Sequence, residues 1–374
     1  TYNKAGTYNV TFTVRRGEEK ATTTRENYIV VSQRGPEARI GLPEEGYESP
    51  YVGVFVPTDV PVTFRDLSAN NPTEWKWAFQ NTDTEESTEQ NPTVTYINKG
   101  VTSVGLIAKN NVGSSQDMMV HAIQAGGYQE VWNIGIEENQ NIAKIALGFY
   151  GNYAGSNWAG LELFAEEYKA PLADARIDSV AVYFATTTTV SPDAEITLTI
   201  NSRNEDGLPG EELAKTSLKA SQLAYDADNV VATIFRFPNS ATIKKGQQFF
   251  VTIGPFPNKS IDVSPYADDI AIYAVRRAAG EKCTTFHFME DQDNQGHSLG
   301  TKSWYKNVDD PLSLTIAPVI NYDTAVTGIN NVQPSNTIGE KQIDSIFTVA
   351  GTRVSNTDAP GVYIIKYTDG STIK

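Results

Sequence analysis

Residues 2–14 read YNKAGTYNVTFTV and residues 96–108 read YINKGVTSVGLIA, and the two stretches align without a gap. In the first stretch, Tyr8, Val10, Phe12 and Val14 fall on one side of an alternating run, with Thr and Asn between them. Alternation with a period of two is typical of a β-strand with one buried face. A repeated strand of this kind predicts at least two copies of one β-module along the chain.

The bulk composition favours a folded, multidomain β-protein and disfavours a nucleic-acid partner. The chain has 374 residues with 40% hydrophobic content, which is enough for two to four domains with cores. The formal net charge is −15, so phosphate backbones are repelled. Because Cys283 is the single cysteine, an intrachain disulfide is excluded. The sequence has no run of 18 or more apolar residues, so it predicts no membrane-spanning helix. No signal peptide is visible, and the first residues fall inside a module, so we expect the natural N-terminus to lie upstream.

A complete second module is predicted over residues 35–126. Trp75, Trp77 and Phe79 alternate with polar residues, a pattern that places all three on one face of a strand. Asn-Pro dipeptides and an Asn-Asn-Val-Gly stretch at 110–113 supply turns between the strands. The first copy, over residues 1–34, holds only the last strands of such a module.

The module resembles the PKD domain, an immunoglobulin-like β-sandwich. The residues that carry this resemblance are Trp77, Phe79, Asn91, Pro92, Tyr96, Gly100, Val104, Leu106, Asn110 and Gly113. The chain departs from the family pattern at residues 80–82, where Gln-Asn-Thr replaces Gly-Asp-Gly. The resemblance implies a spacer module in a surface protein of the Bacteroidota.

Residues 127–322 read as many short strands between turns, which predicts a larger jelly-roll-like double sheet. Strands are expected at 176–184, 194–200, 232–237, 248–253, 270–275 and 312–316, whereas residues 217–223 fit either a strand or a short helix. The region also resembles a β-domain found beside PKD modules in secreted Bacteroidota proteins, on the residues Gly148-Phe-Tyr-Gly-Asn152 and the turn at 207–213.

Residues 323–374 form a third kind of segment with short strands and a Gly-Thr-Arg-Val stretch at 351–354. This pattern resembles the C-terminal sorting domain of the same phylum, which implies export and surface attachment or release. The fold prediction for the whole chain is therefore all-β, with a partial and a complete PKD/Ig-like sandwich, a larger jelly-roll-like sandwich and a small C-terminal β-domain.

Carbohydrate binding is the most concrete chemistry in the sequence. Residues 148–160 combine aromatic rings, which stack on sugars, with amides that bond hydroxyls; the candidate residues are Tyr150, Asn152, Tyr153, Asn157 and Trp158. Trp304 and Tyr305 form a second candidate pair. The alternative interpretation for each is an ordinary core aromatic.

A calcium loop is the favoured candidate metal site, since the partial zinc set Cys283, His287 and His297 matches no familiar spacing. Asp291, Asp293 and Gln295 place oxygens at positions one, three and five, with Gly296 at six. Position twelve is Lys302 where an EF-hand needs Glu, so a full EF-hand is excluded. A polar turn is the alternative, and no other cofactor is predicted.

The sequence contains no zinc-peptidase H-E-x-x-H. Its one G-x-S-x-G match, Gly296-His-Ser-Leu-Gly300, has no helix-forming run after it, as a nucleophile elbow requires, and its 45 acidic residues single out no catalytic pair. We therefore predict a non-enzymatic secreted or cell-surface adhesion protein that contacts an extracellular protein or glycan. Two alternatives are a glycan-binding appendage of a polysaccharide-degrading system and an accessory region of a larger secreted peptidase.

Overall fold

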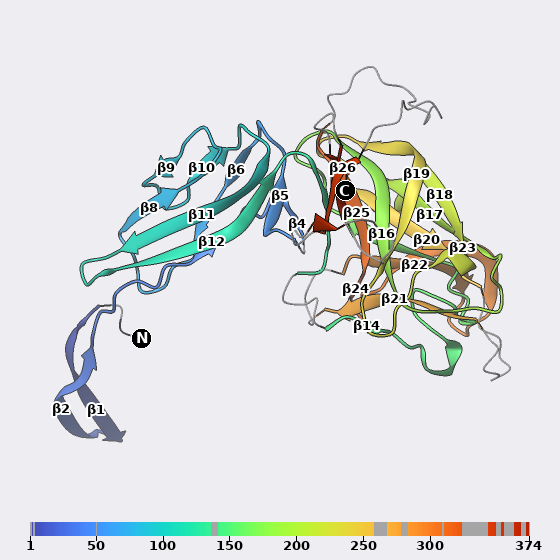
Figure 1. Cartoon of the computed structure of the whole chain (residues 1–374). Coiled ribbons are helices and arrows are strands. Elements are labelled where there is room, and N and C mark those ends of the chain that lie inside the picture. The colour runs from blue at the N-terminus through green and yellow to red at the C-terminus, as the bar shows by residue number, and fades with distance from the viewer. Residues whose placement is uncertain are drawn as a thin grey trace. The chain divides into compact units, whose positions relative to one another are not determined.

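The computed structural model describes residues 2, 4–49, 51–135, 141–257, 268–277, 283–308 and 310–323, together with four strands nearer the C-terminus. The chain divides into two compact units, Thr1–Thr324 and Ala325–Lys374. Figure 1 shows strands throughout, and the described residues contain no α-helix. The predicted all-β fold is thus confirmed.

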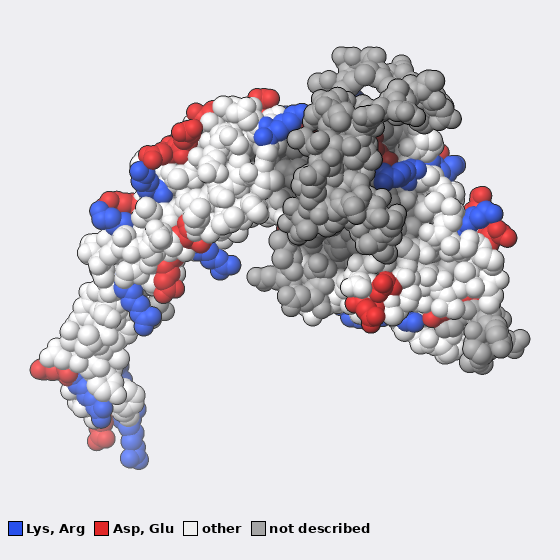
Figure 2. All heavy atoms as spheres, viewed as in Figure 1, with Lys and Arg blue, Asp and Glu red and all other residues white. Residues whose placement is uncertain are grey.

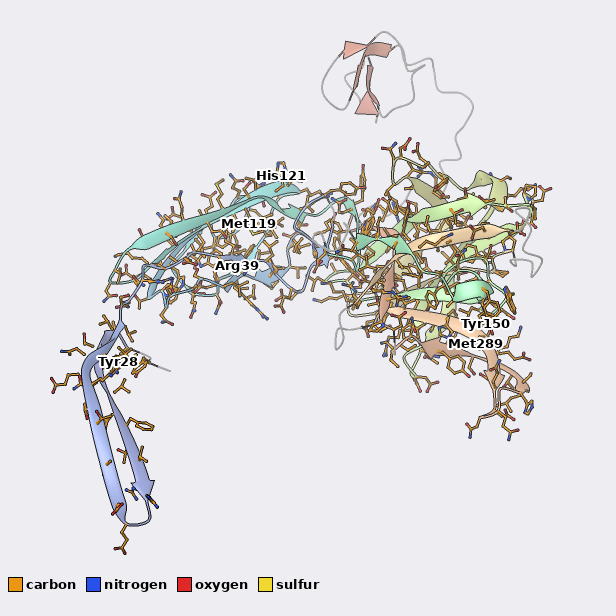
Figure 3. The ribbon with its side chains drawn as sticks, turned by 90° about the horizontal axis from the view of Figure 1, so that it is seen from below. Tyr28, Arg39, Met119, His121, Tyr150 and Met289 are labelled. Atoms are coloured by element: carbon orange, nitrogen blue, oxygen red, sulfur yellow. The ribbon has the colours of Figure 1, made fainter. Side chains whose placement is uncertain are left out.

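The first copy of the repeat forms an antiparallel hairpin of β1 (Gly6–Arg16) and β2 (Glu19–Val31) (Figure 1). Its apolar stripe lies largely in solvent: Phe12 is 64% exposed and Val14 is 50% exposed. Tyr28 projects from the same hairpin in Figure 3. The alternating pattern therefore specifies strands here, although no second sheet from the described residues covers the apolar stripe.

The second copy lies in a complete small sandwich. A six-stranded sheet has the order β4-β5-β12-β11-β8-β9, and two further strand pairs, β10-β6 and β3-β7, contribute to the same core. The core centres on Trp77, Phe64, Tyr96 and Leu106, each at most 1% exposed. The strands are β3 (Ile40–Gly41), β4 (Tyr47–Glu48), β5 (Val54–Val56), β6 (Pro61–Thr63), β7 (Arg65–Asp66), β8 (Glu74–Ala78), β9 (Glu86–Ser87), β10 (Thr93–Thr95), β11 (Gly100–Lys109) and β12 (Ser114–Ala125).

The larger sandwich has two sheets. The first has the order β13-β25-β16-β21-β14, with β19 paired to β16 and β24 paired to β21; the second has the order β18-β17-β20-β15-β22-β23. The strands are β13 (Tyr128–Glu130), β14 (Ala143–Lys144), β15 (Leu163–Tyr168), β16 (Ala175–Thr188), β17 (Glu195–Arg203), β18 (Pro209–Lys219), β19 (Ala232–Ile243), β20 (Phe249–Gly254), β21 (Asp269–Arg276), β22 (Thr285–Gln292), β23 (Ser298–Lys306), β24 (Leu312–Leu314) and β25 (Ile316–Asn321).

All six strands expected in this region are present, with shifted ends. The undecided stretch at 217–223 is shared between the end of β18 and a 3-10 turn, η3 (Ala220–Gln222). Four further strands, β15, β18, β22 and β23, complete the second sheet. The division of the chain into four domains at 34, 126 and 322 stays a prediction.

The core between the two sheets encloses one carboxylate. Glu166 on β15 is fully buried, because its side chain points to the same side as Phe164 and Tyr168. Its oxygens accept hydrogen bonds from the amide of Asn133 at 2.8 Å, the hydroxyl of Thr285 at 2.9 Å, the N–H of Leu314 at 3.1 Å and the hydroxyl of Thr284. Burial raises the pKa of Glu166, and the four hydrogen bonds oppose this shift.

The C-terminal unit contains a four-stranded sheet with the order β27-β26-β28-β29. Its strands are β26 (Ile343–Thr348), β27 (Arg353–Val354), β28 (Tyr363–Tyr367) and β29 (Thr372–Ile373). The resemblance to a sorting domain stays a prediction, and so does the identity of the small sandwich as a PKD domain.

Acidic and basic side chains alternate in small groups over the face shown in Figure 2. Among the described residues, no helix has the length and apolar character needed to cross a membrane.

Candidate functional site

The loop that joins β14 to β15 is held to the sandwich by close backbone contacts. Bridges pair Ala146 with Asn152, Gly151 with Asn157 and Gly155 with Ala271. A Cβ atom at Gly155 would lie 2.0 Å from the carbonyl oxygen of Ile270, so only glycine permits this approach. The loop is therefore a fixed part of the domain.

Buried polar side chains reinforce this attachment. The amide of Asn152 donates to Asp269 Oδ1 at 2.6 Å and to the carbonyl oxygen of Ile270 at 3.2 Å. Within the loop, the amide of Asn157 donates to the carbonyl oxygens of Gly155 at 3.0 Å and Leu161 at 2.9 Å. Both asparagines are at most 3% exposed, and the bonds to the carbonyl oxygens of Ile270 and Gly155 are fully buried, so these side chains favour one loop conformation.

Three aromatic side chains project from this fixed loop, and we call Phe149, Tyr150 and Trp158 the aromatic cluster. Phe149 is 70% exposed, Tyr150 is 41% exposed and Trp158 is half-buried. Their ring centroids lie 4.1 Å apart for Phe149 and Tyr150, 4.4 Å for Tyr150 and Trp158, and 5.1 Å for Phe149 and Trp158. Figure 3 labels Tyr150 on the large sandwich.

The backbone orients the rings of the aromatic cluster. Phe149 and Tyr150 belong to a single 3-10 turn, η2 (Gly148–Tyr150). The indole N–H of Trp158 donates to the backbone carbonyl oxygen of Phe149 at 2.8 Å. The backbone N–H of Trp158 donates to the backbone carbonyl oxygen of Tyr150 at 2.9 Å. The result is contiguous exposed aromatic surface, which is typical of a contact site.

The predicted sugar-binding residues of this loop separate into two groups. Tyr150 and Trp158 belong to the exposed aromatic cluster, as direct stacking on a ligand requires. Tyr153 is only 4% exposed: it packs edge-on against Phe164, and its hydroxyl lies 3.4 Å from Nδ1 of His287. The side-chain amides of Asn152 and Asn157 donate their hydrogen bonds to other residues of the protein. The direct-contact role expected for these three residues is therefore replaced by a structural one.

Trp304 and Tyr305 do not form one site, because neighbouring residues on β23 point to opposite faces. Trp304 packs against Phe288, with ring centroids 5.2 Å apart. Tyr305 stacks on His287 at 6.0 Å and donates from its hydroxyl to Asp291 at 2.7 Å. The predicted pair is thus divided between the two sides of the sheet.

The predicted calcium ligands lie at the β22–β23 hairpin, where protein donors engage both carboxylates. Asp293 Oδ1 accepts the backbone N–H groups of Gln295 at 2.8 Å and His297 at 2.9 Å. Asp291 accepts hydroxyl groups, including those of Tyr305 and Ser303. These bonds lower the pKa of both carboxyl groups. In the described part of the chain, no three His, Cys, Asp or Glu side chains are grouped to hold a metal ion. Calcium binding here stays a prediction.

Sequence reasoning missed a charged group made by Glu167, Arg203 and Lys306. These residues lie on β15, β17 and β23, and the sheet brings them together. Arg203 Nε lies 3.2 Å from Glu167 Oε1, and Lys306 Nζ lies 3.6 Å from Glu167 Oε2. No local motif marks these three residues. Predicting the group would require the pairing and register of the strands, which the sequence does not reveal.

No protein-family model matches the chain, and no curated protein matches its sequence. The solved structures to which the chain shows similarity include two of the following kinds. One belongs to carbohydrate-binding modules of the β-sandwich superfamily, with 14% identity, a TM-score of 0.23 and coverage of 60% of this chain and 98% of that chain. The other is a SusE-like protein, with 7% identity, a TM-score of 0.23 and coverage of 74% of this chain and 98% of that chain. Both TM-scores are too low to carry an argument about function, which therefore rests on the site.

Proposed function

We propose that the large sandwich is a non-catalytic glycan-binding module, with the aromatic cluster as its stacking surface. The observation that carries the proposal is an exposed three-ring surface on a loop that is fixed by buried asparagines. Aromatic rings offer apolar faces that complement the C–H faces of sugars, and a preformed loop loses little conformational entropy on binding.

The place of action that fits this role is the cell exterior. An extracellular glycan is a ligand for a secreted or surface-attached protein, and the net charge of −15 suits a soluble exterior module. Under this proposal, the small sandwich acts as a spacer that presents the large one.

The test is affinity electrophoresis of the full chain in gels that contain neutral or acidic polysaccharides. Trp158→Ala should weaken binding about tenfold or more, because a stacked aromatic is a typical binding hot spot. Tyr225→Ala is the matched control, since Tyr225 is 47% exposed and lies outside the cluster. Equal retardation of Trp158→Ala and the native chain would refute the assignment of the cluster.

A second candidate function is protein adhesion through the small sandwich. One face of β11 and β12 exposes Val101, Ile107, Met118 and Val120 by 43–68%. Exposed apolar surface of this kind is also typical of protein contacts. Adhesion to a protein-coated surface that is lost in Met118→Lys but kept in Trp158→Ala would favour this candidate.

A further inference from the structure

The charged group of Glu167, Arg203 and Lys306 lines a hollow on the second sheet of the large sandwich, on the face turned away from the main core. Alternation along β15 places Glu166 inside and Glu167 on this outer face. The hollow has a volume of about 390 Å³, which lies within the range of small-ligand pockets. Its wall includes Glu167, Arg203, Leu208, Gln248, Phe286 and Lys306.

Two cations and one nearly buried carboxylate meet in this wall. The side chain of Glu167 is only 5% exposed, whereas those of Arg203 and Lys306, which both face it, are 38% and 35% exposed. Asp206 also lines the hollow, so the lining holds two acidic and two basic residues. Because the two cations are partly exposed, they can also contact an anionic group of a ligand in the hollow.

The guanidinium group of Arg203 is held in a fixed position. Its Nε faces Glu167, and its outer end packs against Gly207, where φ is +81°. A Cβ atom at Gly207 would lie 2.6 Å from one terminal nitrogen of Arg203, so glycine leaves the space that the guanidinium group fills. A planar guanidinium group held in this way is suited to a carboxylate, whose two oxygens accept parallel hydrogen bonds.

An apolar wall adjoins the two cations. Phe286 is 3% exposed and packs edge-on against Phe250, with ring centroids 5.2 Å apart. Lys306 Nζ lies 4.9 Å from the centre of the Phe286 ring, and Trp304 packs against the same small cluster. Because Phe286 itself is covered, the apolar surface beside the two cations comes from the half-buried Leu208 and Trp304, which pack against it. Cations next to apolar side chains suit a sugar ring that carries an acidic group.

We infer that the hollow binds a uronic acid unit of a glycan, whose carboxylate pairs with Arg203 and Lys306. The inference deepens the proposed function, since it also needs a glycan ligand, but it concerns residues outside the aromatic cluster. The alternative is that the two cations serve only to neutralise Glu167.

The test uses the full chain with polygalacturonate, alginate and hyaluronate, and with fully methyl-esterified polygalacturonate, which keeps the sugar backbone without its charge. We expect titration calorimetry to show binding of at least one acidic polymer. If polygalacturonate binds, its methyl ester should bind at least tenfold more weakly, because a charge-assisted hydrogen bond is lost. Affinity for the acidic polymer should also fall as salt is raised.

Lys306→Gln is the decisive variant, because Arg203 still pairs with Glu167 and the fold is kept. We expect it to weaken acidic-polymer binding about tenfold, and we expect Lys306→Arg to restore it. Lys302→Gln is the matched control: Lys302 lies on the same strand and pairs with Glu162 at 2.5 Å, outside the hollow. Unchanged affinity in Lys306→Gln, or equal affinity for charged and esterified polymers, would overturn the inference.

The outcomes separate the two proposals. Loss of binding in Trp158→Ala but not in Lys306→Gln would overturn the inference about the hollow and leave the aromatic cluster as the site. The converse result would support the hollow and refute the cluster. No binding of any neutral or acidic polymer by the native chain would overturn both.

Discussion

Two three-ring clusters in this chain show how the same residue types take different roles. In the small sandwich, Trp77 lies 5.9 Å from Phe79 and 6.0 Å from Phe64, and all three rings are at most 5% exposed. In the aromatic cluster, the ring centroids are closer still, at 4.1–5.1 Å, but Phe149 and Tyr150 are exposed and Trp158 is half-buried. A second sheet covers the first cluster, whereas the glycine-rich loop turns the second toward solvent. Ring contacts alone therefore do not distinguish a core cluster from a binding surface. The difference is whether another layer of the protein covers the rings.

The largest expected effect that tests this difference is on the buried cluster. Trp77→Ala should lower the free energy of unfolding of the small sandwich by about 3–5 kcal/mol, because it leaves a large cavity. Phe149→Ala, at an exposed ring, should change stability by no more than about 0.5 kcal/mol. Urea unfolding followed by fluorescence measures both. Similar losses in the two variants would contradict the distinction between core and surface clusters.

A smaller effect is expected at the anchor of the exposed cluster. Asn152→Ala removes two hydrogen bonds and leaves the buried carbonyl oxygen of Ile270 and the partly exposed carboxylate of Asp269 without this donor, at a cost of about 1–3 kcal/mol. We also expect weaker glycan binding, although Asn152 does not touch the ligand, because the loop loses its single conformation. Thermal unfolding and affinity electrophoresis measure the two effects, and the exposed Asn111→Ala is the control. Full binding by a destabilised Asn152→Ala would show that loop attachment is unimportant.

The smallest effect is a difference in pH dependence between the two sandwiches. Burial raises the pKa of Glu166 above its ordinary value of 4.5, so the folded large sandwich holds this proton more tightly than the unfolded chain. The stability from this group is fully present below its unfolded pKa and is lost as pH rises through the raised pKa. No acid is buried in the described core of the small sandwich.

Urea unfolding of the large sandwich should therefore become easier from about pH 4.5 toward neutrality, where 4.5 is the ordinary value for Glu. In Glu166→Gln this dependence should flatten. Part of the slope should persist, because burial also raises the pKa of Glu130 in the same sandwich. An unchanged pH profile in Glu166→Gln would show that Glu166 does not titrate in this window.

The sequence predicted the strands with a clear period of two, and it failed where tertiary packing overrides local preference. β15 reads Leu-Phe-Ala-Glu-Glu-Tyr, which is rich in helix formers and carries two adjacent acids. It is nevertheless a central strand, because Glu166 finds four donors between the sheets and Glu167 finds two cations outside. Those partners lie far from β15 in the sequence, and no local sequence pattern predicts that they will contact it.

The candidate site was predicted in part for a similar reason. Composition alone marked residues 148–160 as rich in aromatic residues and amides, and this choice captured Tyr150 and Trp158. It did not separate them from Tyr153, Asn152 and Asn157, because glycine-rich loops lack the fixed period that shows which side chains point inward. Trp304 and Tyr305 could have been separated, had their residues been recognised as a strand.

The pairing of β13 with β25 has a mechanical consequence. Tyr128, at the start of the large sandwich, lies opposite Asn321, near its end, so the chain enters and leaves this domain at one place. Tension applied along the chain would open this ladder one residue pair at a time, from Tyr128–Asn321 toward Glu130–Val319. The loop with the aromatic cluster lies elsewhere in the domain. Under tension, β13 would therefore separate from β25 before the structure of the ligand-binding loop is disturbed.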